Sequence, residues 1–181
     1  ANDLVLELAT EGNTLTRHVI DGTSTGKTFS AEANVFVDTL IKFTPSEDTP
    51  TISNDVKVAV YVNVNSNLVV YHGTESEETV HSVFDDILIS PNTWKRLTIK
   101  LGSYGATSFC NIYLNGVALT HTNAVGDNQD VFLNAASGSI LNAVAFQGTG
   151  FVDELVVSDD ADLGAGAAIL LTLSYDAGIN T

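Results

Sequence analysis

The stretch from Asn92 to Thr120 constrains the fold most strongly, because its side chains alternate along two runs that end at a tight turn. From Trp94 to Leu101, apolar residues alternate with polar ones, which is the pattern of a half-buried antiparallel strand. A second alternating run, Phe109 to Leu114, is followed by Asn115-Gly116. These two residues tolerate the positive φ that a tight hairpin turn requires. The sequence therefore predicts antiparallel hairpins in this region.

Other short runs with strand composition, separated by turn-forming residues, occur along the rest of the chain. No segment keeps the apolar spacing of an amphipathic helix over three turns. Further strands are expected at residues 3–8, 14–20, 33–43, 56–62, 68–72, 80–83, 87–89, 117–119, 140–147, 151–158 and 168–175. Many short strands with turns between them predict an all-β fold, a jelly-roll β-sandwich of two packed antiparallel sheets.

Two details of this prediction concern the later part of the chain. Residues 120–139 are polar and are expected to form a long irregular surface loop. The strands at 140–147 and 151–158 are expected to pair with each other through Gly148-Thr-Gly150. The single cysteine, Cys110, falls on the apolar side of its strand and is expected to be an inert core residue.

The clearest alternation is that of the four valines in Val56–Val62, which are expected to face the core. The register with the following strand is open. A two-residue turn at Asn65-Ser66 would place Tyr71 opposite Val60 in the core, whereas a three-residue loop would pair Tyr71 with Tyr61.

The size of 181 residues suits one all-β domain, expected at residues 1–160, with 161–181 forming a Gly/Ala linker plus an edge strand or the start of a following domain. The formal net charge is −15 with only seven Lys and Arg residues, which argues against the positive surface that nucleic acid requires. No apolar run approaches the roughly 20 residues of a membrane-spanning helix. We expect an extracellular or cell-surface module, monomeric by itself and flanked by other domains.

Three stretches in the second half of the chain carry a family resemblance. They are Asn92-Thr-Trp94 with Leu97–Leu101, then Ile112–Gly116, then Phe146–Leu155. They resemble the laminin G-like, concanavalin A-like jelly-roll superfamily, whose members often show a tryptophan that opens a strand, an apolar strand that ends in Asn-Gly, and a final strand with Asp-Glu between apolar residues. The resemblance implies a two-sheet jelly roll with Trp94 in the core. Because this fold hosts lectins, carbohydrate-binding modules, glycosidases and adhesion domains, function needs a separate argument.

Catalysis is not indicated by the carboxylates or the histidines. Retaining glycosidases place two carboxylates about 5 Å apart, and on this fold they follow a pattern close to Glu-x-Asp-x-x-Glu. The nearest stretch here, Asp153-Glu154, has apolar residues at the flanking positions. The four histidines are scattered, with no Ser or Cys at a recognisable nucleophile elbow. The sequence therefore predicts a domain that is not an enzyme.

A structural calcium ion is implied by the same resemblance, between an early Asp-Gly loop and the last strand. The ligands would be Asp21 and Asp153, with Glu154 or Asp38 in reserve, and their oxygen atoms suit this hard cation. The sequence leaves an alternative open, in which Asp21 forms a side-chain turn and Asp153 caps a bulge or hairpin.

Carbohydrate binding is the predicted function, because sugars are recognised by aromatic faces beside polar groups that bond the hydroxyls. The candidate residues, taken from outward-facing strand positions and one loop, are Tyr61, Asn63, Arg96, Lys100, Tyr104, Asn111 and Tyr113. Four basic residues on the outward-facing positions, Lys42, Lys57, Arg96 and Lys100, would suit an acidic glycan or would be ordinary solvated positions. The rival function is a structural or adhesion spacer of a large extracellular protein, without a small ligand.

Overall fold

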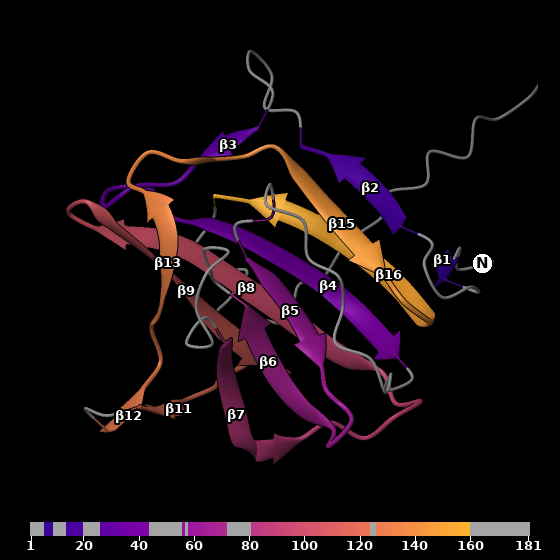
Figure 1. Cartoon of the computed structure of the whole chain (residues 1–181). Coiled ribbons are helices and arrows are strands. Elements are labelled where there is room, and N and C mark those ends of the chain that lie inside the picture. Colours follow the sequence, from indigo (N-terminus) through magenta and orange to yellow (C-terminus); the bar gives the residue numbers. More distant parts are fainter. Residues whose placement is uncertain are drawn as a thin grey trace, which may run out of the picture.

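The computed structural model describes residues 6–8, 14–19, 26–43, 56, 58–71, 81–123 and 126–159. In this part the chain is all β, with antiparallel strands arranged as a β-sandwich (Figure 1). The largest sheet has seven strands in the order β1-β16-β4-β8-β9-β10, with β13 also paired to β9. Their bounds are β1 Leu6–Leu8, β16 Gly150–Ser158, β4 Val35–Phe43, β8 Lys95–Tyr104, β9 Thr107–Leu114, β10 Val117–Ala118 and β13 Val131–Ala136.

The remaining strands form smaller sheets. The strands β5, β6 and β7 make a three-stranded sheet that crosses in front of the seven-stranded sheet in Figure 1. The other sheets are the pairs β2 with β15, β3 with β14, and β11 with β12. The bounds are β2 Thr14–His18, β3 Lys27–Thr28, β5 Ala59–Val62, β6 Asn67–Tyr71, β7 His81–Leu88, β11 His121–Asn123, β12 Gly126–Asn128, β14 Ile140–Leu141 and β15 Ala143–Gln147.

The core lies between the seven-stranded and the three-stranded sheet. The seven-stranded sheet contributes the buried residues Val35, Leu97, Leu101, Cys110, Ile112, Val131 and Leu133, and the three-stranded sheet contributes Leu68, Val70 and Phe84. Successive side chains of a strand point to opposite sides, so one side of the large sheet carries these core residues. We call this side the inner face and the opposite side the outer face.

The predicted central hairpin is confirmed. The β8 and β9 strands pair with Leu101 opposite Cys110, and both side chains join the core. Asn115 and Gly116 have φ values of 51° and 79°, and the turn returns the chain so that Val117 pairs with Leu114. The two positive φ angles are what the sequence pair Asn-Gly provides.

Three of the four valines predicted to face the core, Val58, Val60 and Val62, pack against it. Neither register considered for Tyr71 is the one formed. A three-residue loop after Asn63 contains Ser66 with a φ of 64°, and it places Tyr71 opposite Ala59. Tyr61 pairs with Val69, so both tyrosines lie on the side of β5 and β6 away from the core.

Three strand predictions were wrong. The described part of the expected strands 80–83 and 87–89 belongs to one strand, β7, which ends at Leu88 and whose pairing with β6 shifts register between Leu68 and Asn67. The predicted loop at 120–139 contains β11, β12 and β13, and β13 places Val131 and Leu133 in the core. The strand β15 pairs with β2, whereas β16 pairs with β1 and β4. Alternation shows which side of a strand is apolar, but it does not choose the neighbouring strand.

Some predictions fall on residues outside the described part, namely Asp21, Lys57, residues 161–181 and the predicted strand residues 3–5, 20, 72 and 80. The domain boundary at 160 therefore stays a prediction. Within the described residues, no helix has the length and hydropathy needed to cross a membrane.

Candidate functional site

The outer face of the seven-stranded sheet brings together five of the predicted sugar-binding residues. They are Arg96, Lys100 and Tyr104 on β8, and Asn111 and Tyr113 on β9. Direct pairing of Lys100 with Asn111 and of Thr98 with Tyr113 places these side chains on one face. The structure thus assembles residues that are up to 17 positions apart in the sequence, from 96 to 113.

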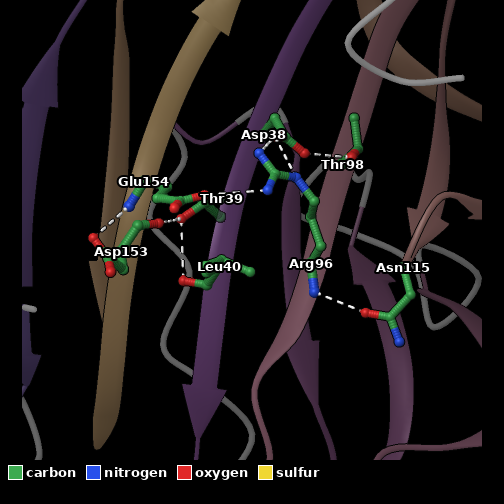
Figure 2. Close-up of polar contacts among 8 residues, drawn as sticks. All are labelled: Asp38, Thr39, Leu40, Arg96, Thr98, Asn115, Asp153 and Glu154. Carbon is green, nitrogen blue, oxygen red and sulfur yellow. Dashed lines mark hydrogen bonds and ion pairs between the residues drawn. The ribbon is translucent and has the colours of Figure 1, made fainter. Parts of the chain in front are cut away.

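At the centre of this face, Arg96 forms an ion pair with a buried carboxylate (Figure 2). The side chain of Asp38 is 0% exposed, and its Oδ2 accepts hydrogen bonds from Arg96 Nε at 2.8 Å and Nη2 at 2.5 Å. The second oxygen, Oδ1, accepts a hydrogen bond from Thr98 Oγ1 at 2.5 Å. The hydrogen bond to Asp38 is the largest cause that raises the pKa of Arg96. A carboxylate this buried requires such partners, because desolvation otherwise disfavours its charge.

A β-bulge in β16 adds a second carboxylate to the same guanidinium. The register with β4 shifts between Asp153 and Val156, and Glu154 has a φ of 50°. The bulge redirects Glu154, whose Oε2 accepts a hydrogen bond from Arg96 Nη1 at 3.1 Å. Arg96 therefore links three strands, β4, β8 and β16, through charged groups.

The carboxylate of Asp153 supports this bulge. Its Oδ1 accepts a hydrogen bond from the Glu154 amide at 2.8 Å, and the Asp153 carbonyl accepts one from Thr39 Oγ1 at 2.9 Å (Figure 2). This is the capping role that the sequence left open beside the metal role. No group of three or more His, Cys, Asp or Glu side chains that could hold a metal occurs among the described residues, and Asp21 lies outside them. Calcium binding through Asp21 and Asp153 stays a prediction.

One end of the outer face carries a stacked pair of rings under a lysine, which we call the Tyr104 cluster (Tyr104, Phe109 and Lys100). The ring of Tyr104 is stacked on Phe109 with centroids 4.6 Å apart and an interplanar angle of 15°. The Lys100 ammonium lies 5.5 Å from the Phe109 centroid. The chain leaves room for the Phe109 ring at Gly102, where an added Cβ would lie 2.8 Å from Phe109 Cζ.

The opposite end of β8 carries a second group, which we call the Trp94 cluster (Trp94, Phe151 and Lys42). The Trp94 ring lies 6.4 Å from Phe151, and Lys42 Nζ lies 5.2 Å from the Phe151 centroid. Lys42 and Phe151 face each other directly across β4 and β16. The resemblance implied a core position for Trp94, but the residue is 40% exposed.

Sequence reasoning omitted the two phenylalanines that support these clusters. The signal was present, because Phe109 alternates with the core residue Cys110 and Phe151 alternates with the buried Val152. Phe132, which pairs with Phe109 and is 48% exposed, was missed because its strand was taken for a loop.

The two β9 candidates, Asn111 and Tyr113, differ in accessibility. Asn111 is 5% exposed, and its Nδ2 donates to the Gln129 carbonyl at 3.0 Å and to Asp130 Oδ1 at 2.6 Å. Asn111 therefore holds residues 129–130, which lead into β13, against β9. Tyr113 is half-buried, and burial, followed by the charge of Asp130, raises its pKa. A sugar-binding role for either residue stays a prediction.

The remaining two candidates, Tyr61 and Asn63, belong to the three-stranded sheet rather than to the outer face. Asn63 Oδ1 accepts hydrogen bonds from the Asn65 and Asn67 amides, both at 3.0 Å, and so closes the loop between β5 and β6. Tyr61 is partly buried, and burial raises its pKa. The structure thus divides the seven predicted binding residues between two sheets.

Comparison with known proteins gives a fold likeness only. No family model and no curated protein matches the chain. A crystal structure of a mutant of HCR/D is similar to it, with a TM-score of 0.51, 12% identity and coverage of 86% of this chain and 39% of that one. The crystal structure of the botulinum neurotoxin serotype G binding domain has a TM-score of 0.45 and 18% identity, with coverage of 86% and 39%. The chain thus spans about 39% of the length of the structures it matches.

Proposed function

We propose that this chain is a non-catalytic carbohydrate-binding domain whose ligand stacks on the Tyr104 cluster. The observation that carries the proposal is an exposed ring that is already held in place. Tyr104 is 61% exposed, yet its ring is stacked on Phe109, which is only 3% exposed. A ring fixed before binding loses little conformational freedom when a sugar packs on it, which favours affinity.

The surroundings of Tyr104 supply the other groups that a sugar needs. The Lys100 ammonium lies over Phe109 and can donate hydrogen bonds to hydroxyl or acidic oxygens. Phe132 pairs directly with Phe109 and extends the apolar surface towards β13. Together these residues combine flat apolar area with a directed polar group.

Binding without catalysis is supported by the state of the nearby carboxylates. Asp38 and Glu154 both accept hydrogen bonds from Arg96, and Asp153 accepts one from the backbone of the bulge. These groups hold β4, β8 and β16 together. The proposed setting is extracellular or at a cell surface, as a module beside other domains, in keeping with a composition that contains only seven Lys and Arg.

The proposal is tested by affinity electrophoresis of the whole chain through gels that contain β-glucan, xylan, polygalacturonate or dextran sulfate. We expect retardation by a small related set of these polymers. Removal of the exposed ring in Tyr104→Ala should weaken binding by about tenfold, which corresponds to the roughly 1.4 kcal/mol that a stacked ring contributes.

Leu88→Ala is the matched control, because Leu88 is 70% exposed on β7, in the three-stranded sheet. It should leave retardation unchanged, and thermal unfolding should show that both variants remain folded. Absence of retardation by any polymer, extended to a broad glycan array, would support a spacer domain instead. Binding that survives Tyr104→Ala would place the site elsewhere.

A further inference from the structure

The Trp94 cluster repeats the construction of the Tyr104 cluster. In each, a partly exposed ring contacts a second ring, and a lysine ammonium lies over that second ring. The distances from Nζ to the ring centroid are 5.2 Å for Lys42 over Phe151 and 5.5 Å for Lys100 over Phe109. The exposed members are Trp94 at 40% and Tyr104 at 61%. The ring pairs differ in geometry, because Tyr104 is stacked on Phe109 whereas Trp94 is tilted by 51° to Phe151, but both clusters contain the same three parts.

Both clusters lie on the outer face. Phe36 pairs directly with Lys100. Lys42 follows Phe36 on β4 by an even number of residues, so both side chains lie on the same face of the sheet. Lys42 in turn pairs with Phe151. The clusters are separated along β8 by the distance from Trp94 to Tyr104, which is roughly 30 Å at a strand rise of about 3.3 Å per residue.

The basic side chains on this face differ in whether a carboxylate pairs with them. Arg96, between the clusters, is engaged by Asp38 and Glu154. Lys42 and Lys100 form no ion pair with a carboxylate within the part of the chain that the structure describes. The exposed Glu7 pairs with Phe151 on the side away from Lys42. In a chain with only seven Lys and Arg and a net charge of −15, the outer face therefore carries two lysines that no described carboxylate pairs, one in each cluster.

We propose that the ligand of this domain is a linear acidic polysaccharide that contacts both clusters at once, an inference that rests on the proposed function. Its sugar rings would stack on Tyr104 and Trp94, and its anionic groups would meet Lys100 and Lys42. Uronate carboxylates and sulfate esters present the same hydrogen-bonding chemistry to an ammonium group. A polysaccharide long enough to reach both clusters occupies two weak sites at once. Its affinity should therefore rise steeply with its length.

Isothermal titration calorimetry first compares the binding of three polymers: polygalacturonate, dextran sulfate and neutral dextran. It then compares size-fractionated oligomers of the acidic polymer that binds. We expect the acidic polymers to bind more tightly than dextran and their affinity to fall as salt screens the lysines. Lys42→Gln and Lys100→Gln should each weaken binding about threefold to tenfold. Trp94→Ala should weaken long chains about tenfold and leave short oligomers unchanged, whereas Trp94→Phe should retain most of the affinity.

Lys95→Gln is the matched control. Lys95 lies on the same strand as Lys100, but it pairs with Ile41, whose side chain packs against the core. This substitution removes one positive charge from the opposite side of β8 and should leave affinity unchanged. Preference for polygalacturonate over dextran sulfate would identify carboxylate as the anionic group, and the reverse preference would identify sulfate.

The remaining outcomes separate this inference from the proposed function. Equal binding of neutral dextran, unaffected by either lysine substitution, would overturn the acidic ligand and leave a sugar site at Tyr104. Binding that depends on Tyr104 but not on Trp94 or on chain length would overturn the two-cluster contact alone. Failure of every polymer and of the glycan array to bind would overturn the proposed function itself, and this inference with it.

Discussion

The inner and outer faces of the seven-stranded sheet share the same strands but are stabilised by different interactions. On the inner face, Cys110 and Ile112 are 0% exposed and contact other apolar side chains. On the outer face, Asp38 and Thr98 are almost as inaccessible, at 0% and 2%, but their burial depends on hydrogen bonds and on Arg96. Apolar packing tolerates many arrangements of similar volume, whereas a buried carboxylate requires particular partners at particular positions. Equal burial therefore has different causes on the two faces.

The largest expected effect tests the inner face. Ile112→Ala removes a fully buried side chain from the centre of β9 and should lower the free energy of unfolding by about 3 to 5 kcal/mol. Chemical denaturation measures the loss. Thr107→Ala, at an exposed position on the outer side of the same strand, should change it by less than about 0.5 kcal/mol. Similar losses for the two variants would show that the faces do not differ as described.

The next effect tests the outer face. Arg96→Met leaves the Asp38 carboxylate buried without its cation and should lower the free energy of unfolding by about 2 to 4 kcal/mol. This loss is towards the lower end of the range for broken buried ion pairs, because the Arg96 side chain is 28% exposed. Adding Asp38→Asn to this variant removes the unpaired charge and should restore part of the loss in the same denaturation experiment. If the double variant were less stable than Arg96→Met, the buried charge would not be the cause.

A smaller effect, the dependence of stability on the pKa of Cys110, tests whether water reaches the inner face. Burial, and to a lesser extent the charge of Asp130, raises the pKa of Cys110 from 9.0 to about 12. Between these values the unfolded chain loses the thiol proton while the folded chain keeps it, so stability falls as pH rises from 9 towards 12. At pH 10 the loss should be about 1.4 kcal/mol relative to pH 8.

The control for this pH effect is Cys110→Ala, which lacks the thiol. The difference in free energy of unfolding between pH 8 and pH 10 should be smaller in this variant by the same amount. Native wild-type protein should also resist alkylation by iodoacetamide at pH 8, since Cys110 is 0% exposed. An identical pH dependence in both proteins, or rapid alkylation, would show that water reaches the inner face.

Much of the strand content followed from local sequence. The alternation around Leu101 and Cys110 fixed the inner side of the central hairpin, and Asn115-Gly116 fixed its turn. The strand at Val131–Ala136 was missed because it lies in a polar stretch, and only its pairing with β9 brings Val131 into the core. Long-range pairing of this kind depends on contacts between distant residues, which local periodicity does not encode.

The same limit applies to the candidate site. Outward-facing positions on β8 and β9 were predictable from their alternation with core residues, and they gave Arg96 and Lys100. Tyr104 was predicted in a loop, whereas it is the last residue of β8. The partners of these residues were not predictable, because Asp38 lies on β4 and Phe109 on β9, and both meet the β8 residues only across the sheet. The bulge that turns Glu154 towards Arg96 has no local sequence signal either, since Glu154 is a non-glycine residue with positive φ.

The sequence by itself determined that this chain forms antiparallel strands, which side of the central strands is apolar, and where the central hairpin turns, because these properties depend on neighbouring residues. Only the tertiary structure decided which strands lie side by side, and hence that Arg96 is engaged by two carboxylates while Lys42 and Lys100 each lie over a ring. The physical reason is that hydrogen bonds, ion pairs and ring contacts act over a few ångströms, so their partners are set by strand order and register.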